Sequence, residues 1–289
     1  MTKEKEYISD DEVVVIGGSD WKPKKGSEHP NRWKIVAFIL TGIMVIVGLY
    51  YIGRHIYHTK EFIQTRNADD VITAFSQPIK GKAGVTPTTE EFMNVKLKIY
   101  RLDGLKAHFA DTVPDYADSS IYLVTRSSDY KIIGDKKEII GDFIFNGKVV
   151  EKSNWRAGFM AIVDSNAQIG IDRSNKIRKY VMDNGGSMFR QLALVSAGIR
   201  CNEQLILKGK VTRCAYGRDK NNTLYYIETE NPETLYGFAD ALIEYGFIDA
   251  IYITGGKQPD LFYRTEDGVS HGSYVDDKPH ELIVWTKAD

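Results

Sequence analysis

The hydrophobic pattern divides the chain into one long apolar run near the N-terminus and many short alternating segments after it. Residues 35–52 are eighteen consecutive positions without a charge, with Trp33 before them and Tyr50 and Tyr51 near their end. A helix of this length rises about 27 Å, which matches the hydrocarbon core of a bilayer, and aromatic residues often mark its interfaces. The pattern predicts a transmembrane helix over residues 35–53 that contacts the lipid bilayer.

Basic residues are denser before this segment than after it. Because positive flanks stay in the cytoplasm, we expect residues 1–34 to form a cytoplasmic tail and the rest of the chain to be periplasmic or otherwise extracytoplasmic. The basic residues before the segment are Lys22, Lys24, Lys25, Arg32 and Lys34, and the nearest ones after it are Arg54, Lys60 and Arg66.

Two other interpretations of the apolar segment are weaker. A cleaved signal peptide is disfavoured because the preceding tail exceeds thirty residues and no small-x-small site follows Ile52. A buried core helix is disfavoured because a soluble helix of this length normally has a polar face. We therefore interpret the segment as a signal anchor.

Residues 54–84 are interpreted as a stalk, with a charged helical stretch through Ala74 followed by proline and glycine. A globular domain is expected over residues 85–289. Thr88 and Glu91 have capping-box spacing, which predicts a short helix before the first strand. Short strands and turns follow to about residue 171. The expected strands are 95–100, 120–125, 139–145, 148–150 and 159–163, with Asn146-Gly147 as a hairpin turn.

A β-α-β unit is the clearest feature of the later sequence. Residues 224–227 alternate as a strand, Asn231-Pro232 predicts a helix start, and apolar residues then recur at helical spacing until Gly246. Residues 250–253 form the second strand, which runs into Thr254-Gly255-Gly256. Ligands often bind at such strand ends. The fold class expected is α+β, with mixed sheets and this late β-α-β unit, preceded by the transmembrane helix.

Composition narrows the range of partners. The net charge of −1 gives no basic surplus, so we expect no nucleic-acid partner. Cys201 and Cys214 form either a disulfide, if the compartment is oxidising, or two buried thiols. No Cys-x-x-Cys or His-rich spacing supports a metal site, and the sequence indicates no particular cofactor.

Several polar positions are candidates for chemistry, and each also has an ordinary structural explanation. Asn184, Gly185 and Gly186 form a flexible turn that lets backbone approach a ligand, or a simple tight turn with Arg190 in a salt bridge. Arg213 precedes a predicted strand and is otherwise a surface arginine. For the acids, the alternatives are helix-dipole stabilisation of Glu228 and a solvent-facing position for Asp142.

Three segments of the later sequence carry a family likeness: Gly185-Gly186 with Phe189-Arg190-Gln191 and Leu194-Val195, then Arg213-Cys214-Ala215-Tyr216-Gly217, and residues 245–256. Together they resemble the phosphodiester glycosidase family, and Ile283-Val284-Trp285 resembles its bacterial members. A weaker likeness reaches back through residues 141–148 to about Ser120, so the likeness covers some 170 residues and no single motif carries it alone. One position departs, because the family's Leu-Asp-Gly-Gly is Ile253-Thr254-Gly255-Gly256 here.

The resemblance implies a hydrolase that cleaves a phosphorylated glycan or glycolipid at the anomeric carbon next to phosphate. Arg190 and Arg213 are then expected to clamp the phosphate, because a planar guanidinium can bind two of its oxygens. Asp142 and Glu228 are expected to activate water or to stabilise an oxocarbenium-like state. The expected substrate-binding residues are Asn184, Gly185, Gly186, Thr254, Gly255 and Gly256.

Two further hypotheses belong to other functional classes. Thr254, at the position of an acid, motivates a catalytically degenerate domain that binds an envelope glycan or protein. The tail and span motivate an interaction module that links an inner complex to an envelope protein partner. Turnover of a sugar phosphodiester distinguishes the first hypothesis from both of these.

Overall fold

The computed structural model describes residues 32–60, 65–134, 136–153, 157–201, 209–256, 261–273, 275 and 279–288. The chain divides into two units, residues 1–57 and 58–289. Most of helix α2 (Arg32–Lys60) lies in the first unit, and its residues 32–54 are long and apolar enough to cross a membrane. Its large apolar side chains are exposed; Phe38, for example, is 82% exposed. The predicted apolar helix is confirmed, and a signal sequence would have the same properties. Tail residues 1–31 lie outside the described ranges.

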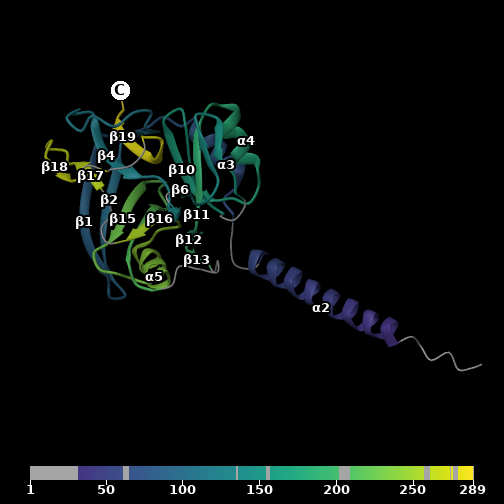
Figure 1. Cartoon of the computed structure of the whole chain (residues 1–289). Coiled ribbons are helices and arrows are strands. Elements are labelled where there is room, and N and C mark those ends of the chain that lie inside the picture. The colour runs from purple at the N-terminus through teal and green to yellow at the C-terminus, as the bar shows by residue number, and fades with distance from the viewer. Residues whose placement is uncertain are drawn as a thin grey trace, which may run out of the picture. The chain divides into compact units, whose positions relative to one another are not determined.

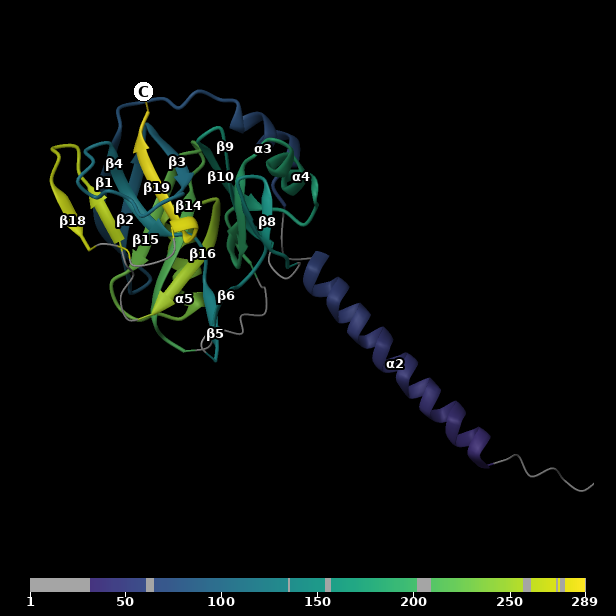
Figure 2. The same ribbon diagram turned by 45° about the horizontal axis from the view of Figure 1, so that its top comes forward.

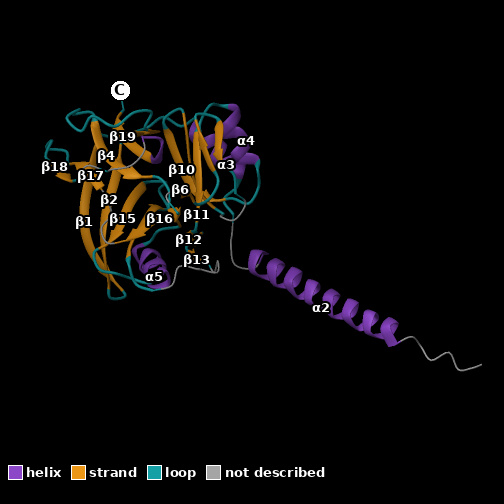
Figure 3. Cartoon of the chain, in the orientation of Figure 1, coloured by secondary structure: helices purple, strands orange, loops and turns teal. Residues whose placement is uncertain are grey.

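The second unit is built mainly from antiparallel strands (Figures 1 and 3). The seven-stranded sheet has the order β1 (Gly84–Phe92), β2 (Val95–Asp103), β15 (Leu224–Thr229), β14 (Thr212–Arg218), β16 (Asp249–Gly256), β12 (Ala193–Ser196) and β13 (Ile199–Arg200). A second sheet has the order β10 (Asn166–Ile171), β9 (Gly158–Val163), β11 (Ser187–Gln191), β7 (Phe143–Phe145) and β8 (Lys148–Glu151).

A third sheet has the order β18 (Ser270–Gly272), β17 (Leu261–Arg264), β4 (Ile121–Arg126), β19 (Leu282–Lys287) and β3 (Leu105–Phe109). Figure 2 shows β3, β4 and β19 side by side. The strands β5 (Tyr130–Ile133) and β6 (Lys136–Ile139) form a separate hairpin. The other helices within the described ranges are α3 (Ala68–Phe75), α4 (Lys176–Asp183), α5 (Leu235–Tyr245) and the short 3₁₀ helix η1 (Pro279–Glu281).

The three larger sheets share a central core. It includes Tyr216 from the first sheet, Phe189 from the second and Trp285 from the third, all buried. A second core lies between the seven-stranded sheet and α5, where Phe238 of the helix joins Tyr252 of β16. Because successive residues of a strand point to opposite faces, β14, β15 and β16 contribute alternately to these two cores. This arrangement explains the apolar runs within these strands, at residues 214–217, 224–227 and 250–253.

The predicted β-α-β unit is present as β15, α5 and β16. Strand β14 lies between β15 and β16 and is antiparallel to both, so the two outer strands are parallel. The helix begins after Thr234, whose hydroxyl accepts a hydrogen bond from Gly237 N at 3.0 Å, rather than after the predicted Asn231. It ends at Gly246 in the left-handed region, at φ 114°, where glycine is favoured.

Two local turn predictions had different outcomes. The hairpin at Asn146-Gly147 is confirmed, since both residues have positive φ and β7 pairs with β8 across them. The helix predicted from Thr88 and Glu91 is wrong, because β1 pairs with β2 over its full length, from Gly84 to Phe92. Nine cross-strand positions outweigh a capping signal that involves only two side chains.

The predicted stalk also needs correction over residues 66–75. Arg66 N donates a hydrogen bond to Ile171 O at 2.8 Å, which fastens the chain to β10. Helix α3 follows, and its buried Val71 and Phe75 pack with Phe159 on the outer face of the second sheet. The reason is the spacing of these two residues, which places both on one face of the helix. These residues therefore belong to the packed domain.

Candidate functional site

The candidate site lies at the end of the seven-stranded sheet where β14 begins and where β15 and β16 end. The strand register places Cys214 opposite Glu228, and Arg213 opposite Gly255. The segment after β4 also reaches this end, because the Thr254 hydroxyl donates a hydrogen bond to Asp129 Oδ1 at 3.4 Å. Polar side chains from four separate parts of the sequence therefore lie at this end of the sheet.

Glu228 is the most unusual group at this end of the sheet. Its side chain is buried, with 6% of the residue exposed, and Oε1 has no hydrogen-bond partner within the described part of the chain. Burial raises the pKa of Glu228 to about 7, although a hydrogen bond from Tyr226 and the charge of Lys98 both favour the ionised form. Lys98 lies directly opposite on β2. A carboxyl group with this pKa can donate or accept a proton near neutral pH.

The Cys214 thiol lies beside Glu228 and shares a hydrogen-bonding neighbour with it, the hydroxyl of Tyr226. Burial and the nearby Glu228 charge raise the pKa of Cys214 well above its usual value. Because the thiolate is the nucleophilic form of cysteine, this thiol is unsuited to nucleophilic attack. Tyr226 and Cys214 instead form the buried surroundings that hold the Glu228 carboxyl.

Arg213 is buried, and its guanidinium is held by the protein itself. Its Nε donates to Glu233 O at 3.0 Å, Nη2 to Gly209 O at 2.9 Å, and Nη1 to the Tyr252 hydroxyl at 3.4 Å. Tyr252 belongs to the core under α5, whereas Tyr226, two residues before Glu228, belongs to the central core. Arg213 and Glu228 therefore point to opposite faces of the sheet.

Asp142 and Arg190 form a second charged cluster, in the second sheet. Arg178 makes two hydrogen bonds to the Asp142 carboxylate, from Nε at 2.8 Å and from Nη2 at 3.3 Å. Arg190 donates to Asp172 O at 2.7 Å and to Ser174 O at 2.9 Å, and burial lowers its pKa. Asp142 thus connects the start of β7 to α4, and Arg190 connects β11 to the segment before α4.

Asn184, Gly185 and Gly186 form the turn between α4 and β11. Asn184 Nδ2 donates to Tyr180 O at 2.8 Å, which closes the end of the helix. Gly185 has φ 67°, and a Cβ on Gly186 would lie 2.7 Å from Ile162 O. These features match the ordinary-turn explanation of the Gly-Gly pair.

Gly255 and Gly256 have different surroundings. A Cβ on Gly255 would lie 2.6 Å from the Tyr252 hydroxyl and 2.8 Å from Thr212 O, so close strand approach requires glycine there. A Cβ on Gly256 would meet nothing within 4 Å. Only the first glycine is therefore needed for packing.

The structure gathers five of the predicted site residues at one end of the seven-stranded sheet: Arg213, Glu228, Thr254, Gly255 and Gly256. The sequence analysis missed Tyr226, Lys98 and Asp129. Alternation on β15 could have placed Tyr226 beside Glu228, but Lys98 and Asp129 approach only through strand pairing and a loop. Within the described ranges, no three His, Cys, Asp or Glu side chains are grouped so as to hold a metal ion.

The thiol state of the protein gives a simple test of this packing. Cys201 and Cys214 are both buried and do not form a disulfide. We expect no reaction of the folded, non-reduced protein with a thiol reagent, and two reactive thiols after unfolding in denaturant. Titration with a chromogenic disulfide measures both values. Unfolded, non-reduced protein without reactive thiols would instead indicate a bridge.

Comparisons with known proteins establish a likeness of fold. No protein-family model and no curated protein sequence matches the chain. A zebrafish N-acetylglucosamine-1-phosphodiester alpha-N-acetylglucosaminidase, whose catalytic domain is auto-inhibited by a pro-peptide, aligns with a TM-score of 0.49 at 12% identity, over 79% of this chain and 87% of that one. A hypothetical protein from Synechocystis aligns with a TM-score of 0.50 at 10% identity, over 71% of this chain and 62% of that one. The second alignment shows a shared fold over less than two thirds of the Synechocystis protein.

Proposed function

We propose that this chain is a membrane-anchored hydrolase that cleaves sugar phosphodiesters outside the cytoplasm, with Glu228 as the proton-transferring residue. The observation that carries the proposal is the buried Glu228 carboxyl, which has a pKa of about 7 and an oxygen without a hydrogen-bond partner among the described residues. The resemblance of residues 184–285 to phosphodiester glycosidases supplies the reaction class. The helix over residues 32–54 supplies the anchor, and its basic N-terminal flank supplies the orientation.

The reaction requires a water molecule, a base and a leaving group. Ionised Glu228 removes a proton from water as the water oxygen bonds to the anomeric carbon, and the bond from that carbon to the phosphate oxygen breaks. The electron pair leaves with the phosphate monoester, which is stable as an anion, so a strong general acid is less necessary than in ordinary glycoside hydrolysis. Glu228 then releases its proton to solvent.

Phosphate recognition in this proposal differs from the clamp expected from sequence. Arg190 and Arg213 donate to the protein's own carbonyl groups, whereas Lys98 is the cation directly opposite Glu228. We therefore assign the phosphate contact to Lys98. The absence of an acid at position 254 is offset by Asp129, whose carboxylate accepts the hydrogen bond of the Thr254 hydroxyl.

The full-length protein in detergent tests the proposal with a chromogenic sugar phosphodiester. We expect Glu228→Gln to lower kcat by roughly 10²-fold or more, because an amide cannot exchange the proton. The wild-type rate should show an ionisation near pH 7 that the variant lacks. Glu230→Gln is the matched control, because this glutamate is on the same chain segment but pairs with Lys96 at the surface. Wild-type kcat in a folded Glu228→Gln protein would refute the proposal.

A non-catalytic glycan-binding domain is the second candidate. It is favoured because Arg190 and Arg213 both donate their hydrogen bonds to carbonyl groups of the protein. A phosphate group would therefore have fewer charged side chains to bind. Glycan binding without turnover by the wild-type protein would support this candidate over the hydrolase.

A further inference from the structure

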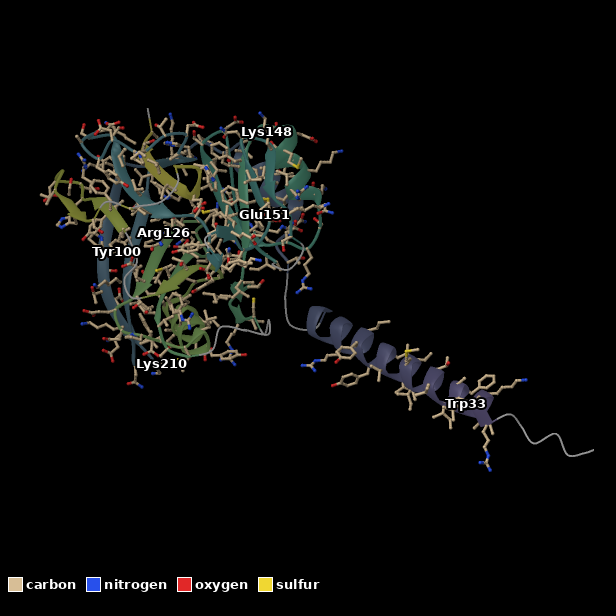
Figure 4. The ribbon with its side chains drawn as sticks, in the orientation of Figure 1. Trp33, Tyr100, Arg126, Lys148, Glu151 and Lys210 are labelled. Carbon is tan, nitrogen blue, oxygen red and sulfur yellow. The ribbon has the colours of Figure 1, made fainter. Side chains whose placement is uncertain are left out.

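A row of aromatic rings connects the surroundings of Glu228 to the protein surface. Tyr226 contacts Tyr100 on β2, with ring centroids 6.0 Å apart, and Tyr100 contacts Tyr263 on β17 at 4.9 Å. Tyr263 in turn stacks on His271 of β18, at 4.8 Å and an interplanar angle of 15°. Figure 4 labels Tyr100 on β2 in this part of the domain. The row begins at the buried carboxyl and ends in solvent.

The outer end of the row presents a flat surface. Tyr263 and His271 are directly opposite each other on β17 and β18, so their side chains share one face of this hairpin. Tyr263 is half-buried and His271 is exposed. One face of the imidazole stacks on Tyr263, and the exposed part of His271 is where a ligand would bind. The apolar face of a pyranose ring packs against such aromatic surfaces, as other flat apolar groups do.

The backbone holds this pair in place. Gly272, next to His271, has φ 82°, and a Cβ there would collide with the Leu261 carbonyl group. Ser273 N donates a hydrogen bond to Leu261 O at 2.9 Å, which ties the strands together again. A surface that is held before the ligand arrives loses less conformational entropy on binding.

The pair is also close to the proposed reacting centre. The charge of Glu228 contributes, after burial, to the raised pKa of Tyr263. Another exposed aromatic residue, Tyr236 on α5, differs because Arg200 covers its ring, with Cζ 5.2 Å from the centroid. Of these two surfaces, only that of Tyr263 and His271 continues into the site.

We propose that Tyr263 and His271 form a sugar-binding platform that holds a pyranose ring of an extended substrate at the surface end of the ring row that leads to Glu228. The assignment rests on the proposed function only in taking Glu228 as the reacting centre. The platform itself makes a claim about binding, which does not require turnover. It therefore predicts affinity for an oligosaccharide even when hydrolysis is blocked.

Binding is measured by calorimetry on the full-length Glu228→Gln protein, in a detergent without a sugar headgroup, with cellotetraose and chitotetraose as probes. We expect at least one probe to bind. His271→Ala should weaken that binding roughly fivefold to tenfold, as expected for loss of one stacked ring. Tyr263→Phe should bind as the parent does, because the ring is retained. Tyr236→Ala is the matched control and should leave the affinity unchanged.

Two results would overturn the platform: no binding of either tetrasaccharide, or equal affinity in the parent and the His271→Ala protein. Its failure is distinguishable from failure of the proposed hydrolysis. Oligosaccharide binding that depends on His271, in a wild type without turnover, would reject hydrolysis and retain the platform. Turnover of a small chromogenic substrate without tetrasaccharide binding would reject the platform alone.

Discussion

The Arg213→Ala protein is expected to lose roughly 2 kcal/mol or more of its free energy of unfolding, because a buried polar group without its partner typically costs about 1–3 kcal/mol and the space left by the side chain adds to this cost. The buried Tyr252 hydroxyl loses the donor Nη1, Gly209 O loses Nη2, and Glu233 O loses Nε but still accepts from Val211 N. The change also removes a large side chain that is only 2% exposed. Urea unfolding followed by tryptophan fluorescence measures the loss.

The neighbouring Lys210 provides the control for this prediction. Its side chain is 63% exposed and meets Glu233 at 3.4 Å, so Lys210→Ala should change stability by less than about 0.5 kcal/mol. The phosphate clamp expected from sequence makes the opposite prediction, namely lost activity in a domain of normal stability. An Arg213→Ala protein that unfolds like the wild type but has no turnover would return Arg213 to the role of a substrate clamp.

Glu228→Gln is expected to make the protein more stable than the wild type at alkaline pH. Folding raises the pKa of this acid from 4.5 to about 7, so the folded state binds the proton more tightly than the unfolded chain does. The stability that depends on this proton is complete below about pH 4.5 and is lost as the pH rises through about 7. Glutamine has no charge to bury, so the variant should gain roughly 3 kcal/mol over the wild type at pH 9.

The measurement is the difference in urea-unfolding free energy between wild type and Glu228→Gln from pH 4 to pH 9. The difference should be small at pH 4 and should grow through neutrality. Glu230→Gln should not show this alkaline gain, because its exposed carboxylate pairs with Lys96, which lowers its pKa. A pH-independent difference for Glu228→Gln would mean that the carboxyl is solvated in the folded protein.

The elements predicted correctly from sequence are those specified by neighbouring residues. The apolar run of residues 35–52 is long enough to define its helix alone. Gly246 and the apolar spacing before it define α5, and Asn146-Gly147 defines the β7–β8 turn. The capping-box helix failed because β1 is stabilised by pairing with β2 along its length, an interaction absent from the local sequence signal.

The sequence by itself determined the apolar helix, the β-α-β unit and the candidate status of Glu228, because spacing and side-chain chemistry are local properties. Only the tertiary structure decided what each polar side chain meets: Asp142 pairs with Arg178 rather than with water, and Arg213 donates to backbone carbonyls. It also connected Tyr263 and His271 to Tyr226 through the ring of Tyr100. Burial, and with it the pKa of a carboxyl group, depends on strands that are distant in sequence but adjacent in the fold.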